Sequence, residues 1–290
     1  MDFTANFPKK FPEQHQNIQP GIEKEMNPTP IFKSEGYGII NGKLKDKVAV
    51  ITGGDSGIGK AAAVALANEG ADIAIIYNNE NEDAEETKKE IEKIGRKCVL
   101  IAGDIKIKDF CNKAIEKIIS SLGKINILIN NAAVQYEQQN IEDITEEQLK
   151  KTFETNIFGT FFMTQATIAH LQKGDSIINT TSITAYRGHE TLIDYSSTKG
   201  ALTSFTRSLA MNLVSKGIRV NAVAPGPVWT PLIPASFDEK KVGNFGTDNK
   251  QGRAAQPVEL AGAYVFLASQ EASFITGTTI HVNGGDMVMS

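Results

Sequence analysis

The chain has 290 residues, 41% of them hydrophobic and 22% charged, and carries a net charge of −4 at pH 7. That balance is typical of a globular protein with enough residues for a sizeable core, arranged as one large domain or two small ones. The slightly acidic composition lacks the excess positive charge that nucleic acid or an anionic membrane would attract, so we predict no nucleic-acid partner and no membrane partner.

The cysteine and histidine content predicts a reduced protein without a bound metal. Both cysteines, Cys98 and Cys111, lie in segments expected to be regular secondary structure, which favours buried thiols over a disulfide framework. The four histidines are scattered without the spacing of metal ligands. The first residues lack the pattern of a signal peptide, and no apolar stretch reaches the ~20 residues that span a bilayer. We therefore expect a cytoplasmic protein.

Residues 1–45 differ from the remainder because they are rich in proline and polar residues and show neither helical nor strand periodicity. Such a segment could be disordered. It nevertheless carries apolar residues that a free tail would not need, namely Phe3, Phe7, Phe11, Ile22 and Ile31. We expect an extended arm that lies on its own domain, residues 46–290, or on a neighbouring subunit.

Strand and helix patterns alternate from residue 46 onward. Short apolar runs rich in β-branched residues predict about seven buried strands, at residues 47–54, 71–77, 97–104, 125–133, 175–182, 218–226 and 278–285. Helical patterns fall between them, at residues 57–70, 82–95, 108–123, 146–171, 194–217 and 258–269. This alternation implies a single-domain, doubly wound α/β fold of the Rossmann type, with parallel strands, helices on both faces and a site at the carboxyl ends of the strands.

The sequence TGGDSGIG, residues 52–59, joins the first predicted strand to the first predicted helix. Its glycine spacing allows a phosphate group to approach the backbone closely, and the helix N-terminus offers free N–H groups to that phosphate. A glycine-rich turn alone also fits a purely structural role, but the strand–turn–helix context favours a dinucleotide site. The turn then supplies Gly53, Asp55, Ser56, Gly57, Ile58 and Gly59 to the cofactor.

Further motifs follow along the chain: GDI at 103–105, NNAA at 130–133, NIFG at 156–159, TTSITA at 180–185, YSSTK at 195–199 and PGPVWT at 225–230. In these motifs, and from Leu44 to the C-terminus, the chain resembles the short-chain dehydrogenase/reductase family. The family commonly has glycine at the position of Ala133, which implies a small change in packing. The arm resembles that of an N-terminally extended bacterial subgroup that includes general-stress-type oxidoreductases.

The resemblance implies a nicotinamide dinucleotide as cofactor. Specificity is read after the second strand, where a carboxylate would bind the ribose of NAD and a basic residue the 2′-phosphate of NADP. This chain has Tyr77, Asn78 and Asn79 there, and a neutral Ser56 in the turn. Without a cation for the phosphate, NAD(H) is slightly favoured and NADP(H) is the alternative, while the two asparagines could also merely form a turn. The other cofactor contacts implied by the resemblance are Asp104, Ile105, Asn131, Ala132, Ala133, Pro225, Gly226, Val228 and Thr230, together with Tyr195 and Lys199.

Tyr195 and Lys199 lie four residues apart, so a helix places them on one face. An isolated tyrosine has a pKa of ~10, too high for proton exchange near neutral pH. A neighbouring lysine and the positive ring of an oxidised nicotinamide would favour the phenolate, and lowering the pKa by ~3 units takes ~4 kcal/mol. The alternative is a packing or surface pair without a catalytic role.

Ser182 ends the fifth predicted strand and could orient a substrate oxygen and stabilise a developing alkoxide. Asn156 is an expensive polar residue in a mostly apolar helix, and the resemblance assigns it a water-linked proton path to Lys199. Each residue has an ordinary alternative, a strand-end hydroxyl for Ser182 and a bond to neighbouring backbone for Asn156. Together with the dinucleotide site they predict reversible hydride transfer between nicotinamide and a carbonyl or a primary or secondary alcohol, with Tyr195 as general acid/base.

Three other functions fit part of the pattern. A catalytically idle sensor or scaffold that binds NAD(P) would use the same fold, but it would not need Asn156, Ser182, Tyr195 and Lys199 together. A sugar-nucleotide epimerase or dehydratase would have a G-x-x-G-x-x-G turn and a sizeable substrate domain, and the sequence has neither. Enoyl reduction is disfavoured because relatives with that activity space the tyrosine and lysine more widely than YSSTK does.

Residues 231–256 lack a clear core pattern and predict a mobile lid over a small-molecule carbonyl or alcohol substrate. Phe237 and Phe245 indicate a partly apolar cleft, although they could simply pack the lid. The resemblance implies a homotetramer built by helix–helix contacts and the last strand, and the apolar residues 284–290 fit such an interface. The residues expected to shape the substrate pocket are Gln135, Ser182, Thr184, Tyr186, His189 and Trp229.

Overall fold

The computed structural model describes residues 7–33 and 42–288. Within them, one seven-stranded sheet has the order β3-β2-β1-β4-β5-β6-β7, and every neighbouring pair of strands is parallel. The strands are β1 (Val48–Thr52), β2 (Asp72–Tyr77), β3 (Cys98–Ala102), β4 (Ile127–Asn130), β5 (Ser176–Thr180), β6 (Arg219–Pro225) and β7 (Thr279–Val282). The central strands are mostly apolar because both of their faces are buried, and the buried Asn130 of β4 donates a hydrogen bond to Asn179 of β5 at 2.9 Å. The predicted strands and the doubly wound fold are confirmed.

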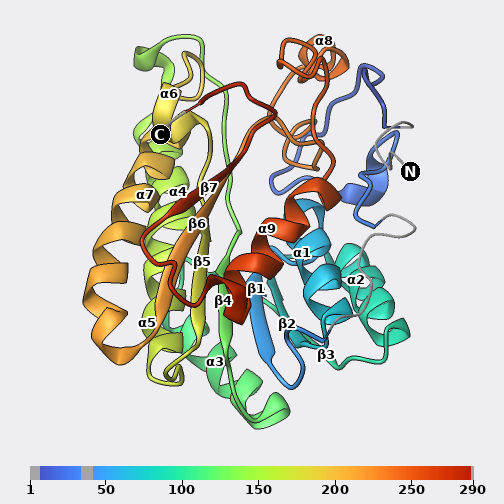
Figure 1. The fold of residues 1–290 in the computed structure, drawn as a ribbon. Coiled ribbons are helices and arrows are strands. Elements are labelled where there is room, and N and C mark those ends of the chain that lie inside the picture. The colour runs from blue at the N-terminus through green and yellow to red at the C-terminus, as the bar shows by residue number, and fades with distance from the viewer. Residues whose placement is uncertain (1–6, 34–41, 289–290) are drawn as a thin grey trace.

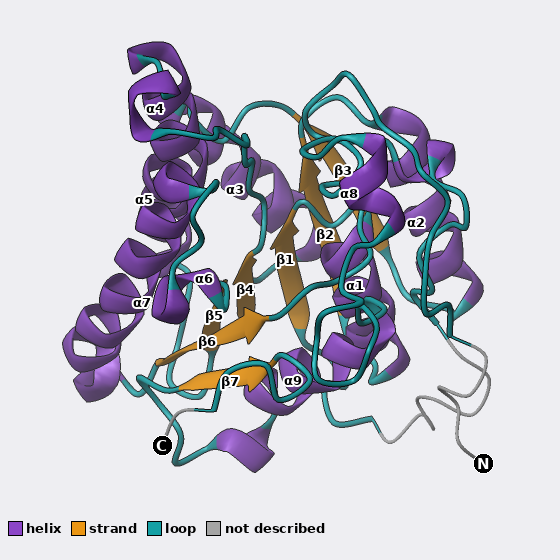
Figure 2. Ribbon diagram, turned by 90° about the horizontal axis from the view of Figure 1, so that it is seen from above, coloured by secondary structure: helices purple, strands orange, loops and turns teal. Residues whose placement is uncertain are grey.

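Helices cover both faces of the sheet (Figure 2). One layer consists of α1 (Gly57–Asn68), α2 (Asn81–Lys93) and α9 (Val258–Ala268), whose buried side chains belong to one hydrophobic cluster. The other consists of α3 (Lys108–Leu122), α5 (Thr160–Ile168) and α7 (Ile193–Leu213), which share a second cluster. Shorter helices are α4 (Glu146–Phe153), α6 (Thr184–Arg187) and α8 (Glu239–Gly243). Among the described residues, no helix combines the length and the apolar character needed to cross a membrane.

The helix predicted over residues 146–171 contains a wider turn that periodicity did not indicate. Between α4 and α5, residues Glu154–Gly159 form a π-helical turn, η3. Asn156 lies in this turn and bonds the main chain of Val134, after β4, through both atoms of its amide. A single π turn leaves the helical period within α4 and within α5 unchanged, so a search for that period does not reveal it, and such turns occur frequently at functional sites.

The described part of the N-terminal arm, residues 7–33, lies against its own domain beside α1, α2 and α8 (Figure 1). Of the expected apolar anchors, Phe7 and Phe11 are buried, whereas Ile22 and Ile31 are half-buried. Phe3 lies outside the described residues. The arm therefore docks on its domain through a few aromatic side chains and, as shown below, through polar contacts.

Residues 231–256 have a core of their own, which they share with the arm. Ile233, Phe237 and Val242 of this segment join Phe11 of the arm and Trp229 in a third hydrophobic cluster. The segment also contains α8. Its apolar residues lack an obvious pattern in the sequence because their partners lie on the arm, far away along the chain.

Candidate active site

The turn between β1 and α1 requires glycine at three positions. Gly53 and Gly57 have φ of +61° and +51°, in the region that side chains strain to adopt. A Cβ atom on Gly59 would lie 1.8 Å from the carbonyl oxygen of Gly53, so a side chain there would force the turn open. Ser56 precedes α1 without capping it through its side chain. The turn thus presents backbone to its surroundings at a helix N-terminus, which suits a phosphate group.

One cavity of about 340 Å³ extends from this turn to the N-terminal end of α7. It lies at the carboxyl ends of the strands, as expected for this fold. The predicted cofactor and catalytic residues that line it are Gly53, Asp55, Ser56, Gly57, Ile58, Tyr77, Asn78, Asp104, Ile105, Asn131, Ala132, Ala133, Ser182, Tyr195, Lys199, Pro225, Gly226, Val228 and Thr230. The predicted substrate residues in its wall are Gln135, Ser182, Thr184 and His189.

Asn131 holds two walls of this cavity together. Its amide donates hydrogen bonds to the carbonyl oxygens of Gly53, at 3.0 Å, and Thr52, at 3.2 Å. Its own backbone N–H donates to the hydroxyl of Thr52 at 3.0 Å. The loop after β4 is therefore fixed against the phosphate-binding turn.

Tyr195 and Lys199 occupy the first turns of α7 and point into the same buried region. Their relative exposures are 8% and 2%, and the Lys199 ammonium lies 5.4 Å from the centre of the tyrosine ring. Lys199 Nζ donates a hydrogen bond of 2.8 Å to the carbonyl oxygen of Thr180, at the end of β5. The sequence prediction that these two residues share a helical face is therefore realised at the cavity.

The charges of the protein alone do not make Tyr195 acidic. Burial raises the pKa of Tyr195 to about 12, and the nearby Ser182 hydroxyl opposes the rise only in part. Burial also lowers the pKa of Lys199 to about 7, which weakens the cation that was expected to stabilise the phenolate. The expected lowering of the tyrosine pKa thus needs a further positive charge beside the ring.

Ser182 has a fixed orientation. Its Oγ accepts hydrogen bonds of 3.1 Å from both the backbone N–H and the hydroxyl of Thr184, the first residue of α6. With its acceptor positions occupied in this way, the Ser182 hydroxyl acts as a donor, and its hydrogen bond with Tyr195 places it beside the phenol at the cavity. Such a donor suits a carbonyl or alkoxide oxygen.

Asn156 does not line the cavity but connects two elements that do. Its Oδ1 accepts from the N–H of Val134 at 2.9 Å, and its Nδ2 donates to the carbonyl of Val134 at 2.9 Å and to Thr198 Oγ1 at 3.1 Å. Thr198 precedes Lys199 on α7. The bond to neighbouring backbone, which the sequence left open for this residue, is therefore present.

Two predicted substrate residues lie elsewhere. Trp229 is fully buried, stacks on Phe11 with ring centres 3.8 Å apart, and donates from Nε1 to the carbonyl of Pro28 at 2.8 Å. It faces the arm because the arm supplies both an aromatic face and an acceptor. Tyr186 meets the edge of the His281 ring at a centroid distance of 4.6 Å, outside the cavity wall. The expectation that these two side chains shape the pocket is corrected.

Two predicted cofactor residues also fall outside the wall. Gly59 lies behind the turn, where it permits the close approach to Gly53 and offers no surface to a ligand. Asn79 is exposed, and its Oδ1 accepts from Asn78 Nδ2 at 3.0 Å, so it helps to form the turn after β2.

The structure adds wall residues that the sequence did not indicate. Glu80, the residue before α2, is one of them, and it brings a second carboxylate to the end of the cavity where the predicted Asp55 lies. Burial, and then the charge of Glu80, raise the pKa of Asp55 to about 7. Glu80 could have been found as the first acidic residue after YNN. The arm contributes Gln19, Pro20 and Gly21, and no sequence signal connects these residues to the site.

A cavity that runs from a glycine-rich phosphate-binding turn to a buried tyrosine–lysine pair fits a nicotinamide dinucleotide. The positive φ values and the space that Cβ atoms would fill are the features that allow the close backbone approach of its pyrophosphate. Among residues 7–33 and 42–288 no group of His, Cys, Asp or Glu side chains is arranged to hold a metal ion. The class of protein defined by this site is a dinucleotide-dependent oxidoreductase.

Known proteins are similar to the chain over nearly its whole length. Residues 53–286 match the family model described as Enoyl-(Acyl carrier protein) reductase. General stress protein 39 of Bacillus subtilis (strain 168) is 58% identical over 284 residues, covering 98% of this chain and 99% of that protein. Glucose and ribitol dehydrogenase of Daucus carota is 48% identical over 285 residues, covering 96% of this chain and 98% of that protein.

A solved structure supports the same assignment. A short-chain dehydrogenase from Burkholderia cenocepacia J2315, in complex with NADP, superposes with a TM-score of 0.79 and 30% identity, over 84% of this chain and 99% of that one. The chain belongs to the short-chain dehydrogenase/reductase family. It is a nicotinamide-dependent oxidoreductase.

Proposed function

We propose that the protein transfers a hydride reversibly between a nicotinamide cofactor and a carbonyl or alcohol carbon, with Tyr195 as the general acid/base. The observation that carries this proposal is the position of Ser182, Tyr195 and Lys199 in the wall of one cavity that begins at the phosphate-binding turn. When bound, the cofactor supplies the hydride and, in its oxidised form, a positive ring. The tyrosine and lysine spacing of YSSTK argues against enoyl reduction, despite the description of the matching family model.

Four side chains of the protein have separate roles in the proposed reaction. Ser182 donates toward the substrate oxygen and orients it. Tyr195 has a pKa of about 12 among the protein groups alone, so it is a protonated phenol that can donate its proton to that oxygen during reduction. Lys199, when protonated, stabilises the phenolate that remains. Asn156 positions α7 through Thr198, and a water-linked proton path from Asn156 to Lys199 is part of the proposal.

NAD(H) is the cofactor that the charges favour. Asp55 and Glu80 place carboxylates at the cavity end formed by the turns after β1 and β2. Neither residues 53–56 nor residues 77–80 contain an arginine or lysine that could pair with a 2′-phosphate. We expect a higher kcat/KM with NAD than with NADP, and a smaller difference in Glu80→Gln. A wild-type preference for NADP would contradict this part of the proposal.

The tyrosine end of the cavity fits a small substrate with several hydroxyl groups. Gln135 and Thr184 offer neutral hydrogen-bonding groups there, and burial, followed by the charge of Arg187, lowers the pKa of His189 so that it is neutral at pH 7. Phe237 and Phe245 add apolar surface for the carbon skeleton. The similarity to glucose and ribitol dehydrogenase supports sugars or polyols as the first compounds to test.

We also propose a homotetramer in the cytoplasm. Phe161 of α5 and Met211 of α7 are 40% and 80% exposed, and an apolar helical surface of this kind suits helix–helix contacts between subunits. Cys98 and Cys111 are buried free thiols, which suits a reducing compartment. Light scattering from the purified protein tests the oligomeric state, and a monomer would contradict it.

Turnover tests the central proposal. The purified protein is mixed with each dinucleotide and a panel of sugars, polyols, aldehydes and simple alcohols, and the absorbance of the reduced nicotinamide is followed. We expect turnover with at least one hydroxyl-rich compound. Dinucleotide binding without turnover across the whole panel would instead support a catalytically idle sensor or scaffold.

A further inference from the structure

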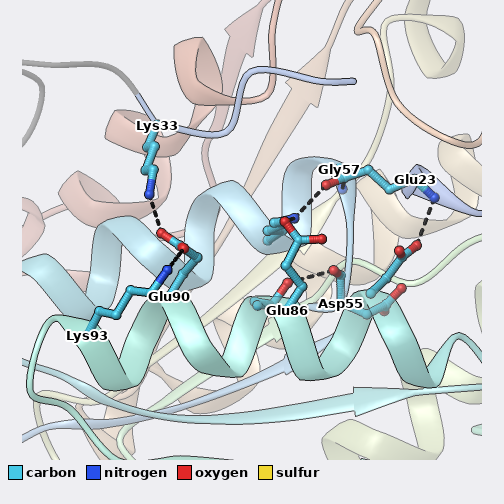
Figure 3. A network of polar contacts seen from close by, with 10 residues as sticks. Glu23, Lys33, Asp55, Gly57, Glu86, Glu90 and Lys93 are labelled. Carbon is cyan, nitrogen blue, oxygen red and sulfur yellow. Dashed lines mark hydrogen bonds and ion pairs between the residues drawn. The ribbon is translucent and has the colours of Figure 1, made fainter. Parts of the chain in front are cut away.

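A carboxylate of the N-terminal arm reaches the phosphate-binding turn. Glu23 lies in a short 3-10 helix of the arm, η1 (Glu23–Glu25), and is only 4% exposed. One of its carboxylate oxygens accepts a hydrogen bond of 2.6 Å from the backbone N–H of Gly57, and the other accepts from Lys60 Nζ at 2.8 Å (Figure 3). The backbone N–H of Glu23 donates to Asp83 Oδ2 of α2 at 2.7 Å.

Both partners on α1 depend on the arm. Gly57 is the first residue of α1, so its N–H has no partner within the helix, and Ser56 does not cap it. Glu23 supplies the missing acceptor. Burial raises the pKa of its carboxyl, whereas the Lys60 ammonium and the Gly57 N–H oppose that rise and favour the charged carboxylate at the helix N-terminus. Gly57 is also the residue whose φ of +51° shapes the turn. A fixed acceptor on this N–H therefore limits the conformations of the turn.

The arm also encloses the Lys60 side chain. Lys60 is 1% exposed, and its ammonium lies 4.3 Å from the centre of the Phe32 ring, another arm residue. Burial alone would lower the pKa of Lys60, but the carboxylates of Glu23 and Glu86 reverse this and raise it. The ammonium is therefore charged and relies on Glu23 as its buried counter-ion, since Glu86 is mostly exposed.

Just before Glu23, the arm forms part of the cavity wall. Gln19 Nε2 donates to the carbonyl of Gln135, at 3.2 Å, and to the carbonyl of Ala235, at 3.0 Å. It thus joins the loop after β4 to the segment over the substrate end. A Cβ on Gly21 would lie 2.2 Å from the carbonyl oxygen of Pro231, so the arm fits closely on that segment. The same stretch of arm contacts both ends of the cavity.

We propose that Glu23 is a positioning residue that fixes the phosphate-binding turn through Gly57 and Lys60 and holds the arm turn at Gln19–Gly21 as a wall of the cavity. Docking of the arm and binding of the dinucleotide are then coupled, and each strengthens the other. This inference rests on the assignment of residues 53–59 as the dinucleotide site. It assigns to the arm a role in cofactor binding, in addition to its packing on Trp229.

The matched pair Glu23→Gln and Glu25→Gln tests this role. Both variants change a carboxylate to an amide in the same turn, but Glu25 is exposed. With equal folding checked by circular dichroism, titration calorimetry with NADH should show a Kd raised about tenfold in Glu23→Gln, within the range of coupled sites. Glu25→Gln should bind NADH like the wild type. Equal NADH affinity in Glu23→Gln and wild type would overturn the inference and leave the proposed function standing.

A second measurement needs no variant. Lys24 is exposed and offers trypsin a cleavage site inside the docked part of the arm. If docking and dinucleotide binding are coupled, saturating NADH slows cleavage after Lys24 in the wild type, and it does not slow cleavage in an unrelated trypsin substrate. An unchanged cleavage rate with bound NADH overturns the coupling. A wild-type protein that binds no dinucleotide at all overturns both the inference and the proposed function.

Discussion

Replacing Lys199 by methionine tests how much the buried, charged ammonium group of Lys199 destabilises the folded protein. The side chain is 2% exposed, and the hydrogen bond to the carbonyl of Thr180 is the one described for its Nζ. Methionine has a similar length and no charge, so it suits the buried site. The Lys199→Met variant should lose turnover, because the phenolate of Tyr195 loses its cation, while the folded protein becomes more stable near neutral pH.

The expected gain follows from the pKa of Lys199, which burial lowers from 10.5 to about 7. At about 1.4 kcal/mol per pH unit, that difference corresponds to about 5 kcal/mol. The protonated Lys199 therefore lowers the free energy of unfolding by about 5 kcal/mol. Methionine leaves the Thr180 carbonyl without its donor, which costs about 1–3 kcal/mol. The net stabilisation of Lys199→Met is therefore about 2–4 kcal/mol below about pH 7.

The difference in unfolding free energy between Lys199→Met and the wild type changes sign as the pH rises. The pKa of Lys199 is lower in the folded protein, so the unfolded chain binds more protons between about pH 7 and pH 10.5. Wild-type stability therefore rises through this window relative to the variant. The advantage of methionine is largest below about pH 7, shrinks as pH rises, and reverses between about pH 8.5 and about pH 10, where the falling cost of the buried charge equals the cost of the lost hydrogen bond.

Urea unfolding at the two ends of this pH range measures the difference. The single tryptophan, Trp229, is fully buried and reports unfolding through its fluorescence. Lys216→Met serves as the control, because Lys216 is exposed and its replacement should change stability little at any pH. If Lys199→Met lowered stability by the same amount at both ends of the range, burial of the ammonium would not carry the assigned cost.

Two further predictions concern residues that support the site. Trp229→Ala removes the fully buried ring that stacks on Phe11. It should lower the free energy of unfolding in urea by about 3–5 kcal/mol and speed proteolysis of the arm. Unchanged stability would show that the arm docks without this contact. Asn156→Ala leaves the N–H and C=O of Val134 unpaired and should cost about 2–4 kcal/mol together with a fall in kcat. A stable Asn156→Ala enzyme with wild-type kcat would contradict the positioning role of Asn156.

The sequence predicted the sheet and the glycine-rich turn from local patterns, and most of the other cavity residues from the resemblance to the short-chain dehydrogenase/reductase family. Most strands contain a run of buried apolar residues, such as residues 48–51 in β1, since helices cover both faces. Gly53 and Gly57 are recognisable because only glycine adopts their backbone conformation readily. Tyr195 and Lys199 were paired from helical spacing alone.

The features that were missed arise from contacts between distant segments. Trp229 lies within the motif PGPVWT, between the cavity residues Val228 and Thr230, yet its environment is set by Phe11 of the arm. Glu23 contacts the phosphate-binding turn at Gly57, and the local sequence around neither residue indicates this contact. The pKa of Tyr195 also depends on burial, which periodicity does not reveal, and the protein groups alone raise it.

The most direct test of the catalytic account is the turnover of Tyr195→Phe. This change removes only the phenolic oxygen and leaves the ring that packs in the third hydrophobic cluster. With folding and NADH affinity unchanged, the account predicts a fall in kcat of about 100-fold or more, as expected for a lost general acid/base. A Tyr195→Phe enzyme that keeps wild-type turnover would contradict it.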